Sequence, residues 1–180
     1  MTQAYVLLDR DGVINHDSDD YIKSPEEWHP IAGSLEAIAL LNKHDYKVIV
    51  ITNQSGISRG YYDEAVLEKI HQKMHQLTAE KGGIIDAIFY CPHGPNDHCD
   101  CRKPKPGLLN TFAEQNNLSL TNIYFIGDKV GDAQAAIAAG AKPMLVKTGK
   151  GQNTLNNNPD INTPIFEDLY AAAKFIISEK

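Results

Sequence analysis

The chain has 180 residues, of which 42% are hydrophobic and 22% are charged, and its formal net charge is −6. This length suits one domain with a core of ordinary size, and the acidic balance argues against a protein that binds the phosphate backbone of nucleic acids. No apolar run is long enough to span a membrane and the N-terminus carries no basic and apolar leader, so we expect a cytoplasmic protein.

The first half of the chain alternates strand and helix patterns. Residues 4–8 are apolar without alternation, which is typical of a strand buried on both faces, and residues 47–52 repeat that pattern. Between them, residues 12–32 form a long polar connection, and loops of this length are often functional. Gly33-Ser34 opens a helix, with Ser34 as the expected N-cap. An apolar stripe predicts a second helix over 63–80.

The second half continues the alternation. Strands are expected over 84–90, 122–126 and 143–146, and helices from 106 onward, over 131–139 and over 166–177. Residues 91–105 hold the cysteines and read as an irregular loop, whereas the Asn- and Gly-rich residues 149–164 read as a mobile one. The alternation predicts one α/β domain over residues 1–180, a three-layer α/β/α Rossmann-like fold with a parallel sheet.

Polar side chains stand where the buried strands end. Asp9 and Asp11 follow the first strand, Thr52 ends the second, Asp128 follows the fourth, and Lys103 comes after the cysteine loop. The carboxyl ends of parallel strands meet at one edge of a sheet, which is where such folds bind ligands. Carboxylates gathered there would repel one another without a cation, and aspartate oxygens are common ligands of Mg²⁺.

This set of residues suits phosphoryl transfer. Asp9 can act as the nucleophile, and Asp11 can protonate the leaving alkoxide and later take a proton from water. Thr52 and Lys103 can hold the phosphoryl oxygens, where charge builds up in the transition state. Each residue alone also has an ordinary structural explanation: Thr52 could simply end its strand, and an isolated pair of acids could be solvated.

The three cysteines lie within eleven residues, at Cys91, Cys99 and Cys101. Together with His93 they offer three thiolates and one imidazole, a set suited to tetrahedral zinc in a closed structural site. His98 is a competing ligand, and three free thiols remain the alternative. A metal here would fix the two residues that follow the last cysteine, Arg102 and Lys103.

The motifs in this order resemble those of the haloacid dehalogenase superfamily: Asp9-x-Asp11-Gly12, Thr52, a lysine before a later helix, and Gly127-Asp128-x-x-x-Asp132. The resemblance covers nearly the whole chain. It implies a magnesium-dependent phosphatase with an aspartyl-phosphate intermediate, in which Asp9 is the nucleophile and Asp11 the acid and base. It also implies that Asp9, the backbone carbonyl of Asp11 and Asp128 bind Mg²⁺, with Asp132 supporting the metal indirectly. Asp132 could equally cap its helix.

The cysteine loop narrows the resemblance to two groups of small phosphatases that carry such a zinc loop and no large cap domain. These are the heptose 1,7-bisphosphate 7-phosphatases and the histidinol-phosphate phosphatases. Residues 52–60 and 127–129 look like the first group. This implies removal of the 7-phosphate of a heptose bisphosphate, a step toward the lipopolysaccharide core. The first alternative is a phosphatase that acts on histidinol phosphate. A further alternative is a nucleic-acid 3′-phosphatase, and the last is a non-catalytic binding protein with the same fold.

The expected partner is a small phosphorylated sugar, with no nucleic acid and no membrane, and we expect a monomer. Arg102 offers a planar fork for the phosphate that does not react. Acids and an aromatic ring at Asp17, Asp19, Asp20 and Tyr21 would instead suit the cationic histidinol. The residues expected to contact substrate are Asp17, Asp20, Tyr21, Asn53, Gln54, Ser55, Arg102 and Lys129.

Overall fold

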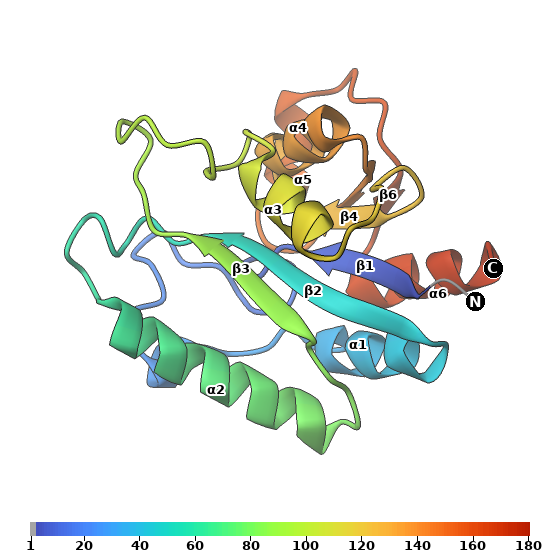
Figure 1. Cartoon of the computed structure of the whole chain (residues 1–180). Coiled ribbons are helices and arrows are strands. Elements are labelled where there is room, and N and C mark those ends of the chain that lie inside the picture. The colour runs from blue at the N-terminus through green and yellow to red at the C-terminus, as the bar shows by residue number, and fades with distance from the viewer. Residues whose placement is uncertain (1–2) are drawn as a thin grey trace.

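Six parallel strands form one sheet in a computed structural model that describes residues 3–180 (Figure 1). Their order is β3-β2-β1-β4-β5-β6. The strands are β1 (Ala4–Leu8), β2 (Tyr46–Asn53), β3 (Ala87–Cys91), β4 (Tyr124–Gly127), β5 (Lys142–Val146) and β6 (Ile165–Phe166). The helices are α1 (Ser34–Lys43), α2 (Glu64–Glu80), α3 (Gly107–Gln115), α4 (Val130–Ala139), α5 (Gly151–Asn157) and α6 (Leu169–Ser178), with a 3₁₀ turn η1 (Pro25–Glu27). The predicted α/β fold with a parallel sheet is confirmed.

The alternation of side chains along each strand builds a separate core on each face of the sheet. In β1, Val6 and Leu8 join the core under α1, α2 and α6, whereas Leu7 joins the core under α3 and α4. All three side chains are fully buried, which explains why the strand reads as a continuous apolar run. The helices in Figure 1 lie in two layers on either side of the sheet, as this division requires.

The order in which strands are added to the sheet switches direction between the neighbouring strands β1 and β4. Strands β1, β2 and β3 add in one direction, and β4, β5 and β6 then add in the other. Strands β1 and β4 are paired in parallel with Leu8 opposite Ile126, so the residues that follow each strand emerge side by side. Such a switch point is where open α/β sheets bind their ligands. Asp9 and Asp128 therefore meet at this edge.

The long connection between β1 and α1 is folded against the sheet. Isolated bridges join Asn15 to Asp11 and to Pro30, and Trp28 is fully buried in the core. Our prediction that Ser34 is the N-cap of α1 was wrong: Gly33, at a positive φ of 83°, holds that position. The hydroxyl of Ser34 instead donates a hydrogen bond to the carbonyl oxygen of Val13 at 2.7 Å, which ties the start of the helix to the connection.

Two further predictions from local composition were wrong. Residues 149–164 contain the helix α5, because Gly151 packs directly on the backbone of Val146 and Thr154 donates a hydrogen bond to the carbonyl oxygen of Asp128 at 2.7 Å. Residues 165–166 add the short strand β6, so the last helix begins only at Leu169 with Asp168 as its N-cap. Within residues 3–180, no helix combines the length and the apolar character needed to cross a membrane.

The backbone at Gly12 predicts a specific cost of substitution. Gly12 has a φ of 85°, and a Cβ there would overlap the carboxylate of Asp128. Gly60 has a φ of 77° and open space around it. We expect Gly60→Ala to lower the free energy of unfolding by about 1 kcal/mol through backbone strain, and Gly12→Ala by about 1–3 kcal/mol more through overpacking. Urea unfolding of both variants checks this, and equal losses would contradict it.

Candidate active site

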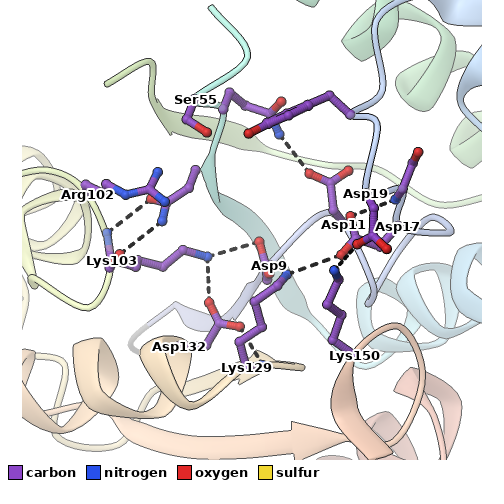
Figure 2. A pocket seen from close by; sticks show the side chains of 14 residues that line it. Asp9, Asp11, Asp17, Asp19, Ser55, Arg102, Lys103, Lys129, Asp132 and Lys150 are labelled. Carbon is purple, nitrogen blue, oxygen red and sulfur yellow. Dashed lines mark hydrogen bonds and ion pairs between the residues drawn. The ribbon is translucent and has the colours of Figure 1, made fainter. Parts of the chain in front are cut away.

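A cavity of about 370 Å³ opens at the carboxyl edge of the sheet, over the switch point between β1 and β4. Residues from the ends of β1 and β2, the cysteine loop and the start of α4 converge on it (Figure 2). Its lining comprises Asp9, Asp11, Asp17, Ser18, Asp19, Tyr21, Asn53, Gln54, Ser55, Arg102, Lys103, Lys129, Asp132 and Lys150. Four of the motif residues, Asp9, Asp11, Lys103 and Asp132, therefore lie around one cavity at this edge.

Lys103 lies at the base of the cavity and joins three elements. Its ammonium contacts Asp9 Oδ1 at 3.0 Å and Asp132 Oδ1 at 2.7 Å, and Figure 2 shows it reaching between these two carboxylates. It also donates to the carbonyl oxygen of Ile51 in β2 at 2.9 Å. An ammonium has three N–H donors, so all of them are engaged. Burial disfavours the charged form, but the two carboxylates outweigh it and raise the pKa of Lys103.

Asp132 has two structural tasks at the start of α4. Its Oδ2 accepts hydrogen bonds from the backbone amides of Asp128 and Lys129, both at 3.1 Å, and its Oδ1 pairs with Lys103. The first contact is the helix-capping role that its position suggested, and the second places its charge beside Asp9. Because both oxygens are engaged, Asp132 is arranged to support its neighbours.

Asp128 is fully buried beside the N-terminus of α4. Its Oδ2 accepts the backbone amide of Lys150 at 2.9 Å, and its Oδ1 lies 3.2 Å from Lys129 Nζ. Burial raises the pKa of Asp128 to about 6, against the opposing charge of Lys129. Burial and the neighbouring Asp132 likewise raise the pKa of Asp9 to about 8, despite Lys103 and Lys129.

Asp11 stands in a different electrostatic environment, although it is only two residues from Asp9. Its Oδ1 accepts from Arg10 Nη2 at 2.9 Å and Asn15 Nδ2 at 2.9 Å, and its Oδ2 accepts from Gln54 Nε2 at 3.0 Å. Burial alone would raise its pKa, but the charge of Arg10 and these hydrogen bonds outweigh it and hold the pKa of Asp11 below its usual value.

The carboxylates of Asp9, Asp128 and Asp132 offer oxygens that all lie within 4.8 Å of one another. All three residues are buried, and the cations beside them are Lys103 and Lys129. Hard oxygen donors at this spacing, in surplus over the local positive charge, fit a divalent cation such as Mg²⁺.

The cysteine loop gathers a second group of donors. Cys91, His93, Cys99 and Cys101 also present ligand atoms within 4.8 Å of one another. The Sγ atoms of Cys91 and Cys101 are 2.8 Å apart, and His93 Nδ1 lies 3.3 Å from Cys101 Sγ. The group contains His93 and does not include His98. Three thiols and one imidazole in this arrangement fit tetrahedral zinc.

Asn53 ties the cysteine loop to the sheet. Its Nδ2 donates to the carbonyl oxygen of Lys103 and its Oδ1 accepts the backbone amide of Lys103, both at 3.1 Å. The side chain of Arg102 donates to the carbonyl oxygen of His93 at 3.2 Å while it lines the cavity. These hydrogen bonds therefore hold Arg102 and Lys103 in defined positions at the cavity.

Three predicted residues do not line the cavity. Thr52 is buried behind its wall, where its hydroxyl accepts a hydrogen bond from Gln54 Nε2 at 3.0 Å. Asp128 is covered by Lys129. Asp20 is exposed on the connection, where its backbone amide binds the Ser18 hydroxyl. The neighbouring residues Asp17, Ser18, Asp19 and Tyr21 line the cavity instead.

Sequence reasoning missed several residues of the site. Lys150 lines the cavity and pairs with Asp19, but it lies in the segment predicted to be a mobile loop. Arg10 is fully buried and its guanidinium pairs with Asp11, a location that its charge did not suggest. Tyr62 and His71 stand behind Gln54 and Arg10, and no motif or spacing marks them in the sequence.

Comparisons with known proteins identify relatives over nearly the whole length of the chain. A family model described as HAD-hydrolase-like matches residues 100–172. A D-glycero-beta-D-manno-heptose-1,7-bisphosphate 7-phosphatase of Pseudomonas putida is 55% identical over 172 residues, which cover 96% of this chain and 98% of that protein. The corresponding protein of Pseudomonas aeruginosa is 54% identical, with 98% and 99% covered. A crystal structure of D,D-heptose 1,7-bisphosphate phosphatase from Bordetella bronchiseptica, complexed with magnesium and phosphate, has a TM-score of 0.96 at 47% identity, with 98% of this chain and 99% of that chain covered.

The environment of His71 predicts a pH-dependent stability. Burial and the charge of Arg10 lower the pKa of His71 to about 3, against the opposing charge of Asp11, and the exposed His75 lies nearby. The unfolded chain binds a proton near pH 6.5 and the folded chain does not, so stability falls as pH falls from 6.5 toward 3. The free energy of unfolding should lose about 2–3 kcal/mol from this group between pH 6.5 and 4.5.

Urea unfolding of His71→Gln across this pH range tests the assignment. The variant should show a flatter decline in the free energy of unfolding, because its side chain does not titrate. His75→Gln, on the exposed side of the same helix, is the matched control and should keep the decline of the unaltered chain. Parallel pH profiles for His71→Gln and the unaltered chain would contradict the prediction.

Proposed function

The chain belongs to the D-glycero-beta-D-manno-heptose-1,7-bisphosphate 7-phosphatases, and from this premise we propose that it removes the 7-phosphate of that sugar bisphosphate through an aspartyl-phosphate intermediate. The proposal rests mainly on the arrangement of residues at the base of the cavity. There Asp9 meets the buried ammonium of Lys103, and Asp11 stands two residues away on the same wall. These are the groups that phosphoryl transfer to a carboxylate requires.

In the first half of the reaction, a carboxylate oxygen of Asp9 attacks the phosphorus of the 7-phosphate. Mg²⁺ beside Asp9 would favour this ionised form against the burial that raises its pKa. The bond between phosphorus and the sugar oxygen breaks, and Asp11 gives its proton to that departing oxygen. The negative charge of the bound phosphate would raise the pKa of Asp11 from its lowered value, so that Asp11 can carry this proton. In the second half, water attacks the phosphorus of the aspartyl phosphate, Asp11 takes a proton from that water, and the bond from Asp9 to phosphorus breaks. Inorganic phosphate leaves and both carboxyl groups return to their starting forms.

Lys103 holds the nucleophile in place for this attack. Its contacts with Asp132 and Ile51 fix the ammonium, which then restrains Asp9 and offers positive charge near the phosphoryl oxygens. Asp9, the backbone carbonyl of Asp11 and Asp128 would hold Mg²⁺, with Asp132 supporting them. When bound, Mg²⁺ would neutralise charge on the phosphoryl group. Contact of Thr52 with a phosphoryl oxygen stays a prediction.

The mouth of the cavity supports a sugar bisphosphate as the substrate. Arg102 presents a guanidinium to the cavity, which suits the phosphate at the other end of the sugar. Ser55 and Tyr21 offer polar groups for sugar hydroxyls. The predicted contact of Gln54 with substrate is not supported, because Asp11 and Thr52 engage its amide nitrogen and Tyr62 engages its oxygen. In this role the connection and the cysteine loop select the substrate, and the base of the cavity performs the chemistry.

Histidinol phosphate fits the mouth less well. The acids that could bind its ammonium and imidazole already have cationic partners: Asp17 lies 3.6 Å from Lys129 Nζ, and Asp19 pairs with Lys150. A cationic substrate would have to displace these lysines. A cytoplasmic location, a monomeric state and a place in lipopolysaccharide core synthesis also stay predictions.

We propose that Cys91, His93, Cys99 and Cys101 hold a structural zinc ion. All four ligand positions would be filled by the protein, which leaves none for a reacting group. The ion would hold Cys101, the residue directly before Arg102 and Lys103. It would therefore fix the backbone position from which these two side chains extend. The loop would then be a support for the cavity and take no part in the chemistry.

Phosphate release with Mg²⁺ tests the proposed activity. The substrates are both anomers of heptose 1,7-bisphosphate, histidinol phosphate, fructose 1,6-bisphosphate and a 3′-phosphorylated oligonucleotide. The beta anomer of the heptose bisphosphate should give the highest kcat/KM, by about tenfold or more. Asp9→Asn should lower turnover by at least about 10³-fold with an unchanged thermal unfolding profile. A preference for histidinol phosphate, or turnover sustained in Asp9→Asn, would overturn the proposal.

Elemental analysis should find about one zinc ion per chain. Cys99→Ser should lose it, and the free energy of unfolding should fall by about 3 kcal/mol, the stabilisation expected from closing a loop of this size. For a chain of this length the corresponding decrease in Tm is about 6–12 °C. His98→Gln is the matched control, because His98 lies in the loop but outside the ligand group, and it should keep both zinc and stability. Equal zinc content in Cys99→Ser and the unaltered chain would refute the site.

A further inference from the structure

Arg10 is a fully buried cation that the proposed chemistry does not use. A buried charge is costly unless it is paired and hydrogen bonded, so its partners indicate its purpose. Its Nε and Nη2 donate to Asp11 Oδ1 at 3.1 and 2.9 Å, and its Nη2 also lies 3.3 Å from Gln54 Oε1. Its remaining terminal nitrogen, Nη1, lies 3.1 Å from His71 Nε2.

The partner of Arg10 on α2 must be a neutral histidine. A guanidinium only donates hydrogen bonds, so His71 Nε2 must accept, and the ring proton must reside on Nδ1. Burial and Arg10 lower the pKa of His71 to about 3, which keeps the ring in this neutral form. His71 therefore holds the far side of the guanidinium, while Asp11 holds the near side.

The side chain of Gln54 is oriented by two donors. The Tyr62 hydroxyl donates to Gln54 Oε1 at 2.6 Å, and Arg10 approaches the same oxygen. Because burial raises the pKa of Tyr62 to about 12, its hydroxyl keeps its proton. With its oxygen taken, the Gln54 amide must turn its nitrogen toward Asp11 Oδ2 and Thr52 Oγ1, each at 3.0 Å.

The consequence is an asymmetric Asp11 carboxylate. Its Oδ1 accepts hydrogen bonds from two nitrogens of Arg10 and from Asn15 Nδ2. Its Oδ2 accepts one, from Gln54, and the residue lines the cavity. Oδ1 is thereby saturated, whereas Oδ2 accepts a single hydrogen bond from the side chains of residues 3–180 and keeps a second lone pair for a proton.

We propose that Arg10, Tyr62 and His71 are positioning residues that lock Asp11 in one orientation, so that its Oδ2 is the oxygen that exchanges the proton with the departing sugar oxygen. This inference rests on the proposed function, in which Asp11 is the general acid. Tyr62 acts through Gln54, and His71 acts through Arg10. A carboxylate without this brace would rotate, and Oδ2 would spend less time facing the leaving group.

The dependence on the leaving group tests this role. An alkyl phosphate needs a proton on its departing oxygen, whereas p-nitrophenyl phosphate has a leaving group that departs without one. The value of kcat/KM depends only on the steps up to departure of the alcohol. The later attack of water on the aspartyl phosphate therefore does not affect it. Tyr62→Phe and His71→Leu should lower kcat/KM about 10–100-fold for the heptose bisphosphate and at most about threefold for p-nitrophenyl phosphate.

Two further variants separate positioning from folding. His71→Gln retains an acceptor for Arg10 and should restore most of the activity on the alkyl phosphate. His75→Gln, one turn along the same helix and exposed, should match the unaltered chain on both substrates. Thermal unfolding establishes that each variant is folded. If His71→Leu does not fold, Tyr62→Phe, which removes only a hydroxyl, still tests the positioning role.

Equal losses on both substrates, or no loss on either, would overturn the positioning role. The proposed function is judged separately, because it depends on which substrate the unaltered chain prefers. If that chain prefers another alkyl phosphate, the same comparison with p-nitrophenyl phosphate is made on that substrate, and the role of the three residues is decided all the same.

Discussion

The ammonium of Lys103 is the interaction on which the rest of the site depends. It is buried, and a buried cation is tolerated only when acceptors surround it. Those acceptors come from β1, β2 and α4, through Asp9, the carbonyl of Ile51 and Asp132. The chain must therefore bring the end of the cysteine loop across the carboxyl edge of the sheet. The braced loop, the packed start of α4 and the fixed nucleophile all follow from this one requirement.

Much of this could be predicted from the sequence, because the relevant signals are local. Continuous apolar runs mark strands buried on both faces, and the acids that follow them are placed by the topology of a parallel sheet. Asp9, Asp11 and Asp128 were found in this way. The cysteine spacing favoured His93 over the competing His98, and the structure groups His93 with the three cysteines. Neither inference needed the conformation of any loop.

What could not be predicted depends on contacts between distant parts of the chain. Helix α5 forms in an Asn-rich segment because Gly151 packs on β5 and Thr154 bonds to Asp128, and neither contact has a sequence signal. No sequence signal indicates the burial of Arg10, because its partners His71 and Gln54 are 61 and 44 residues away in the chain. On the connection, a turn of the backbone decides that Tyr21 faces the cavity and Asp20 does not. Composition gives no information on such a turn.

The reciprocal pair of hydrogen bonds between Asn53 and Lys103 has a consequence for how this scaffold can vary. The Asn53 carboxamide donates one hydrogen bond and accepts one, as a backbone peptide group would. It thereby continues the hydrogen-bonding pattern of β2 to the backbone of Lys103, which is not part of a strand. The loop between Cys91 and Cys101 is thus anchored at both ends, by β3 where it begins and by this substitute peptide where it finishes. The residues between those anchors do not line the cavity, so insertions or exchanges among them should leave Lys103 in place. The composition of the loop is thereby separated from the position of the Lys103 ammonium.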